Sequence, residues 1–184
     1  MRMMEEFEEP MDALEMLRAD HDRVLEMFEH FADAKDTIDD DDKDALVARI
    51  CGELIVHTAI EEELFYPEGR AAAGDARTGD LLDVATVEHA SAKDLIAQLG
   101  EMEPHDALYD AKVIVLGEYV RHHIREEQNE IFARLRDAGL DLDDLGRRMA
   151  QRRTELMEEI GLADLDELLP QGLLRAGRGE VRTG

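Results

Sequence analysis

The chain of 184 residues is long enough for one domain with a substantial core, and a single cysteine, Cys51, excludes an intramolecular disulfide framework or a CxxC motif. A net charge of −25 argues against nucleic acid or an anionic membrane as a partner. No basic N-terminal region with an apolar stretch precedes the acidic start, and no window approaches the roughly 20 apolar residues of a membrane span. We therefore expect a cytoplasmic protein.

Apolar residues that recur every three or four positions predict the first two helices. The first has Pro10 in its first turn and runs through Phe31 to the acidic run at residues 39–42. The second follows Asp42 as its N-cap and ends at Pro67. The Gly- and Ala-rich segment after this proline is predicted to be a loop.

Three further helices follow the same periodicity. The third is predicted to begin near residues 78–80 and to end at Pro104, and the fourth ends near Gly139. Asp141 is predicted to cap a fifth, shorter helix that runs to about residue 160. Four long amphipathic helices with short connections are typical of a bundle.

The fold class expected is all-α, an up-down-up-down four-helix bundle with an additional short C-terminal helical segment. We divide the chain into an N-terminal extension at residues 1–10, the bundle at 11–140, a C-terminal helical segment at 141–169 and a tail at 170–184. The composition of the tail predicts that it is disordered.

Four of the seven histidines fall within the apolar stripe of a different predicted helix: His21, His57, His89 and His123. A lone histidine among apolar residues is usually a core residue with a hydrogen-bond partner. Four are harder to explain in this way, because each buried polar group without a partner costs roughly 1–3 kcal/mol. The remaining three are predicted to lie at the surface: His30, His105 and His122.

Two glutamates share these apolar stripes. Glu61 and Glu127 each follow a histidine by one helical turn, in HTAIEEELFYP (residues 57–67) and in HIREEQNEIF (residues 123–132). Two ionised carboxylates buried in one core need cations between them. Imidazole and carboxylate donors without a thiolate indicate iron, or manganese as the less favoured ion, before zinc or copper.

This pattern resembles that of the hemerythrin-like family, the HHE cation-binding domains, over roughly residues 11–137. The family has one histidine on the first and third helices and HxxxE on the second and fourth, which corresponds here to His21, His57, Glu61, His89, His123 and Glu127. The resemblance implies two iron ions in a non-haem centre with an oxo or hydroxo bridge. It also implies that the two glutamates bridge the irons while the histidines are terminal ligands.

Two positions depart from the oxygen-carrying hemerythrins. Lys93 stands where those proteins have a second histidine on the third helix, and Gln128 stands where they have an aspartate. Four histidines, two bridging carboxylates and an oxo or hydroxo bridge fill about ten of the twelve positions of two octahedral irons. The remaining open positions argue against simple oxygen carriage.

Several neighbours are secondary candidates. Glu62 and Glu126 could orient histidine N–H groups, although solvated helix surface is the commoner fate of such residues. Tyr119 could line an access path or pack as a core aromatic. Tyr66 and Phe132 are predicted to close one end of the bundle.

Two functions remain open. The first is a non-haem di-iron protein that binds, senses or reacts with a small-molecule ligand such as O2, H2O2 or NO, with oxidase- or peroxidase-like activity as one form of that chemistry. The alternative is a redox-quiet iron-binding or cation-binding module for iron sensing or storage that signals through a partner. No separate set of catalytic residues is evident.

Overall fold

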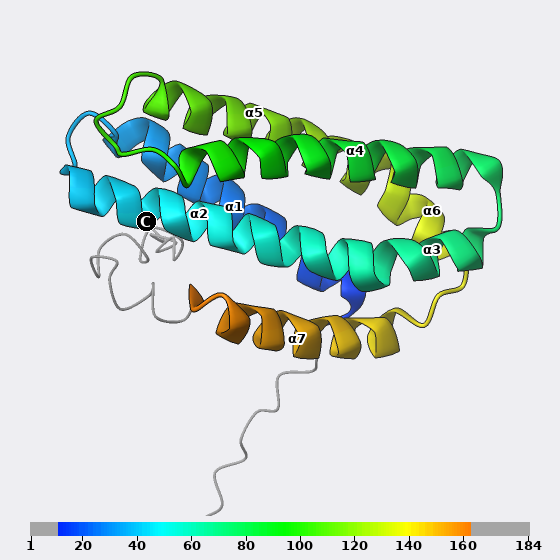
Figure 1. Cartoon of the computed structure of the whole chain (residues 1–184). Coiled ribbons are helices and arrows are strands. Elements are labelled where there is room, and N and C mark those ends of the chain that lie inside the picture. Colours follow the sequence, from blue (N-terminus) through cyan, green and yellow to red (C-terminus); the bar gives the residue numbers. More distant parts are fainter. Residues whose placement is uncertain (1–10, 163–184) are drawn as a thin grey trace, which may run out of the picture.

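The computed structural model describes residues 11–162, and its regular structure within this range is helical, which confirms the all-α fold. The bundle consists of the four helices α1 (Ala13–Ala34), α2 (Asp40–Ile60), α4 (Ala76–Leu99) and α5 (Tyr109–Glu126) (Figure 1). The predictions for Pro10, for the extension at residues 1–10 and for the tail at 170–184 lie outside the described residues.

Two of the long helices continue beyond a short π-helical turn. The turn η1 (Glu61–Phe65) leads from α2 into α3 (Tyr66–Ala73), and η2 (Glu127–Ile131) leads from α5 into α6 (Phe132–Asp137). In a π-turn, hydrogen bonds join residues five apart, and such turns are frequent at functional sites. Both turns begin at one of the two glutamates that the sequence singles out.

Aspartate side chains begin four of the helices. Those of Asp12, Asp39, Asp75 and Asp141 each accept a hydrogen bond from the backbone N–H three residues later. Asp141 therefore caps α7 (Leu142–Glu159) as predicted. The expectation that Asp42 caps α2 was wrong, because Asp39 takes this role and accepts from the Asp42 N–H.

The prediction that a helix ends at Pro67 was also wrong. Pro67 falls in the first turn of α3, where a missing N–H costs no helical hydrogen bond, because the preceding π-turn resets the register. The helix continues through Ala73, so most of the expected loop is helical. Gly74 ends it in the left-handed conformation, with φ of 62°.

The core consists of two apolar clusters with a polar layer between them. One cluster contains Leu17 on α1 and Leu82 on α4, and the other contains Val24 and Ala92 on the same two helices. His21 and His89 lie between these positions along their helices. Helices α1, α2 and α4 each contribute apolar residues to both clusters, whereas α5 contributes to the second cluster and its continuation through η2 and α6 contributes to the first.

Helix α7 packs along α1 and α2, on one side of the bundle (Figure 1). Its apolar stripe, which includes Leu145 and Met149, is buried in the first cluster. Gly146 permits a close approach to the start of α1, because a Cβ at this position would lie 2.6 Å from the carbonyl oxygen of Met11. Within residues 11–162, no helix has the length and apolar character that crossing a membrane requires.

Candidate metal centre

The structure brings all six predicted metal-binding residues into the polar layer. They come from α1, α2, η1, α4, α5 and η2 in turn: His21, His57, Glu61, His89, His123 and Glu127. All six side chains are buried. His105 and His122 are exposed as predicted, whereas His30 is half-buried.

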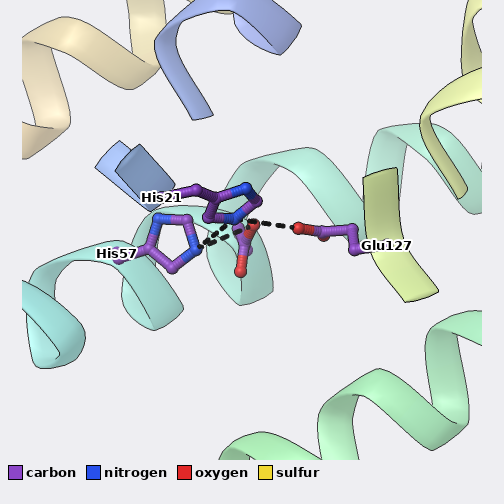
Figure 2. Close-up of side chains that lie close together, drawn as sticks. His21, His57 and Glu127 are labelled. Atoms are coloured by element: carbon purple, nitrogen blue, oxygen red, sulfur yellow. Dashed lines mark hydrogen bonds and ion pairs between the residues drawn. The ribbon is translucent and has the colours of Figure 1, made fainter. Parts of the chain in front are cut away.

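Four of these residues form a first group. The Nε2 atoms of His21 and His57 lie 3.1 Å apart, and His21 Nε2 lies 3.2 Å from Glu127 Oε2 (Figure 2). His57 Nε2 lies 3.3 Å from Glu61 Oε1. Donors that bind one ion at about 2.0–2.2 Å lie roughly 3 Å from one another, so these separations suit a single metal ion.

A second group shares Glu61 with the first. His89 Nε2 lies 3.1 Å from His123 Nε2 and 3.2 Å from Glu61 Oε2. Glu61 therefore directs one oxygen to each group, which is the geometry of a bridging carboxylate. Glu127 Oε1 lies instead 3.1 Å from the hydroxyl of Tyr66.

Orphaned polar atoms show that these residues suit cations. Glu61 Oε1 and Glu127 Oε2 are buried without a hydrogen-bond partner among the described residues. The four inward Nε2 atoms face one another in pairs, and a proton can satisfy only one bond in each pair. Positive ions between the donors would pair both carboxylates and all four nitrogens at once.

The electrostatics of the two carboxylates differ. Burial and the charge of Glu127 raise the pKa of Glu61 well above its usual value. Burial also acts on Glu127, but the nearby imidazoles, that of His21 first, lower the pKa of Glu127 below its usual value. Burial and the neighbouring His123 lower the pKa of His89 to about 2, so His89 is neutral and ready to bind a metal at physiological pH.

Tyr66 belongs to the centre, which the sequence did not predict. Its hydroxyl lies 3.1 Å from Glu127 Oε1 and 3.4 Å from both Glu61 Oε2 and His89 Nε2. Phe132 stacks on His21, with ring centroids 5.9 Å apart. Each aromatic follows its glutamate by five residues, a spacing that shares a face in a π-turn but not in an α-helix.

The hemerythrin HHE cation binding domain family matches residues 12–135 of the chain. The chain belongs to this family. Its HHE domain contains a histidine and glutamate cluster that could hold a metal. The family match also covers all six residues of the candidate centre.

Two known proteins are similar to this HHE domain protein. The crystal structure of an HHE cation binding domain-containing protein from Mycobacterium kansasii superposes with a TM-score of 0.70 at 22% identity, covering 90% of this chain and 98% of that one, and so shows the same fold. A DNA nickase from Nostoc sp. is 27% identical over 127 residues. That alignment covers 69% of this chain but 34% of the nickase, so the chain corresponds to about a third of that protein.

The outward Nδ1 atoms of His21, His89 and His123 have hydrogen-bond partners, and that of His57 faces a carboxylate at a longer distance. The Nδ1 of His89 lies 2.9 Å from Glu62, one of the two secondary candidates, and that of His21 lies 2.9 Å from the Gln128 amide. His57 faces Asp20 at 3.6 Å. Partners of this kind orient an imidazole and raise its basicity as a ligand.

The partner of His123 was not predicted. Its Nδ1 lies 2.8 Å from Glu88 Oε2, whereas the secondary candidate Glu126 contacts the exposed His122. Glu88 belongs to α4, a different helix from His123, so no spacing within one helix could reveal the pair. Sequence reasoning finds partners on the same helix face far more easily than those on a neighbouring helix.

A cavity of about 30 Å³ adjoins the centre of the HHE domain. All four inward histidines line it, together with Val24, Ala92 and Tyr119. Because one water needs about 10–15 Å³ of such space, the cavity suits molecules of one to a few heavy atoms. Tyr119 lines this cavity and is 51% exposed, a position that suits an access path better than a buried core aromatic.

Proposed function

We propose that the centre holds two iron ions and that the protein binds, senses or reacts with a small molecule such as dioxygen, peroxide or nitric oxide there. The observation that carries this proposal is the position of Glu61, which presents one oxygen to each donor group. Nitrogen and oxygen donors without a thiolate favour iron over softer metals.

The donor set leaves room for a further ligand. Four imidazole nitrogens and four carboxylate oxygens provide at most eight bonds, fewer than two octahedral ions accept. An iron pair would supply Lewis acidity and redox chemistry to a molecule that enters the cavity. The cavity of about 30 Å³ restricts such a molecule to a small one.

The protein's own residues prepare the centre for this role. Burial keeps His89 neutral, and Glu62 accepts its Nδ1–H, so that Nε2 is left as the donor toward the ion. Tyr66 donates a hydrogen bond to Glu127 and so stabilises its ionised form. The apolar clusters on both sides exclude bulk water from the polar layer.

We do not extend the proposal to the activity that the name of the Nostoc relative describes. The matched region is about a third of that protein. A net charge of −25 also opposes the approach of a polyanion. Nucleic acid is therefore not among the partners that we propose.

Metal content is the first test, measured by elemental analysis of protein purified without chelators. We expect about two irons per chain, and we expect the same content in Glu63→Ala, a control whose exposed side chain pairs with Arg152. One metal per chain, or two zinc ions, would overturn the di-iron assignment.

Reactivity is the second test. The metal-free protein is loaded with ferrous iron without oxygen, and O2, H2O2 or NO is then added while the near-ultraviolet and visible absorption are recorded. Rapid changes that recur over many additions are expected for a centre that reacts. A slow, single oxidation with no turnover and no NO complex would favour the redox-quiet sensing or storage module instead.

A further inference from the structure

Glu88 connects the buried centre to the surface. One of its carboxylate oxygens, Oε2, accepts the Nδ1–H of His123 at 2.8 Å. The other, Oε1, faces outward and lies 3.7 Å from Nε2 of His122. His122 is exposed, so this second oxygen meets a group that solvent can reach.

The other two carboxylate partners of the inward histidines have a permanent cation beside them. Arg153 lies 2.8 Å from Asp20, and Lys93 lies 2.8 Å from Glu62. Within residues 11–162, Glu88 has no such pairing with lysine or arginine. The exposed His122 and a second carboxylate, Glu126, take that place.

The carboxylate of Glu126 leaves the surroundings of Glu88 and His122 with more negative than positive charge. Glu126 Oε1 lies 3.4 Å from the same Nε2 atom of His122. Two carboxylates thus share one imidazole, whereas at Asp20 two arginines share one carboxylate. A divalent cation would balance the charges of Glu88 and Glu126. It would take the place that Arg153 has beside Asp20 and Lys93 has beside Glu62.

The geometry of the three donors suits such an ion. His122 and Glu126 have the same HxxxE spacing on one helix as His57 with Glu61. One donor atom from each of His122, Glu126 and Glu88 lies within 4.8 Å of the other two. Donors bound tetrahedrally at about 2.0–2.2 Å lie roughly 3.3–3.6 Å apart, close to the two His122 distances of 3.4 and 3.7 Å.

We propose that Glu88, His122 and Glu126 form an exchangeable surface site for a divalent transition-metal ion at the mouth of the buried cavity. A hollow of about 250 Å³ is lined by Glu88, His122, Ser91 and Tyr119. It shares Glu88 and Tyr119 with the cavity at the centre. Three protein donors leave the remaining positions to water, so an ion captured here can leave again.

The number of cobalt ions bound per chain tests this proposal. Full-length, metal-free protein is titrated with Co2+ by equilibrium dialysis and elemental analysis. We expect His122→Ala and Glu126→Gln each to bind one ion fewer than the wild type. Glu88 is left unchanged in this experiment, because its contact with His123 would affect the buried centre as well.

His105→Ala is the matched control. His105 is an exposed histidine that lies 3.9 Å from the single carboxylate of Asp40, and its removal is expected to leave the cobalt count unchanged. A thermal melt of each metal-free variant checks the fold. Since His122 is 60% exposed, we expect the melting temperatures to match that of the wild type.

The difference between variants, and not the total, decides this question. An equal cobalt count in wild type, His122→Ala and Glu126→Gln would overturn the surface site and would identify His122 as a simple ion-pair partner. A loss of the same size in His105→Ala would also overturn it, as non-specific binding. The total count reports on the buried centre separately, so either proposal can fail while the other stands.

Discussion

The two sides of the candidate centre are built from the same motif but are closed in different ways. On the side of His57, Asp20 lies between the imidazole of His57 and Arg153 of α7. On the side of His123, Glu88 joins the ring to the exposed His122 and to a hollow at the surface. Helix α7 covers α1 and α2 and leaves α4 and α5 uncovered (Figure 1).

This difference shows that a repeated spacing need not produce an equivalent environment. The HxxxE motif fixes the inward donors on both sides, because one helical turn separates its two residues. What lies behind each histidine depends on elements outside the motif, namely α7 on one side and solvent on the other. The side of His57, covered by α7, is the closed side, and the side of His123 is the open side, which in the proposals above is the route for small ligands and ions.

The largest effect is expected from the two glutamates, which are equivalent in sequence but not in structure. Glu61→Ala removes a donor from both groups and should lower the iron content from about two to below one per chain. Glu127→Ala removes a donor from the first group only, so about one iron should remain. Elemental analysis after identical purification measures both.

Glu62→Ala serves as the control for this comparison. It removes a partner of His89 Nδ1 but no inward donor, so the iron content should stay near that of the wild type, although loss of such a partner weakens binding by about 10–100-fold. Equal iron loss in Glu61→Ala, Glu127→Ala and Glu62→Ala would contradict the assignment of the inward donors.

The second prediction compares the closed and open sides through stability. Asp20→Asn removes the buried carboxylate that Arg153 and Arg23 share, and within the described residues only Glu53 remains as an acidic partner of Arg153. The substitution should lower the free energy of unfolding by about 1.5–3 kcal/mol, the range for a hydrogen bond to a charged group. The value lies somewhat below that of a fully buried pair because the second partner, Arg23, is 40% exposed. Glu88→Gln should cost less than about 1 kcal/mol, since its carboxylate has no arginine or lysine partner within residues 11–162.

Urea denaturation of the metal-free variants measures this difference. The metal must be absent, because bound ions stabilise the folded state by an amount that depends on their concentration. Equal losses for Asp20→Asn and Glu88→Gln would show that α7 does not hold the closed side through this ion pair.

The fold could be predicted from sequence because its helices follow apolar periodicity and its turns contain strong capping residues. The exceptions are local. Pro67 ordinarily indicates a helix end, but a π-turn directly before it lets the chain continue into α3. Apolar periodicity cannot detect this π-turn, because the turn adds one residue to the helix without requiring any particular residue type.

The inward donors of the site were predictable for the same reason as the helices, because each lies in an apolar stripe. Tyr66 was missed because the π-turn is what directs it toward Glu61. Glu88 was missed because it reaches His123 from another helix. Contacts that depend on an irregular turn or on the packing between helices leave no local pattern in the sequence.

The third prediction concerns Tyr66, which has a hydroxyl group where the corresponding residue of the second motif, Phe132, has none. Tyr66→Phe removes the hydroxyl that donates to Glu127 and leaves Oε1 buried without it. We expect the metal-free protein to lose about 1–3 kcal/mol of unfolding free energy in urea denaturation. Phe132→Tyr, which places a hydroxyl on the other side, is the matched variant and should not restore the loss in a double mutant.

The smallest effect is the pH dependence of the closed side, which can be followed at Glu53. Burial acts against its charge, but Arg153 and Arg23 outweigh burial and lower the pKa of Glu53 below its usual value. A carboxylate with a lowered folded-state pKa stabilises the protein fully above its unfolded pKa of about 4.3, and this contribution is lost as the pH falls through the folded-state pKa. The free energy of unfolding of metal-free wild type should therefore decline below about pH 5, and it should decline less steeply in Glu53→Gln.

Urea denaturation at a series of pH values from neutral to acidic measures both slopes. Parallel slopes would show that the ion pairs with α7 do not govern acid stability, and the closed side would then be held chiefly by the apolar stripe of α7.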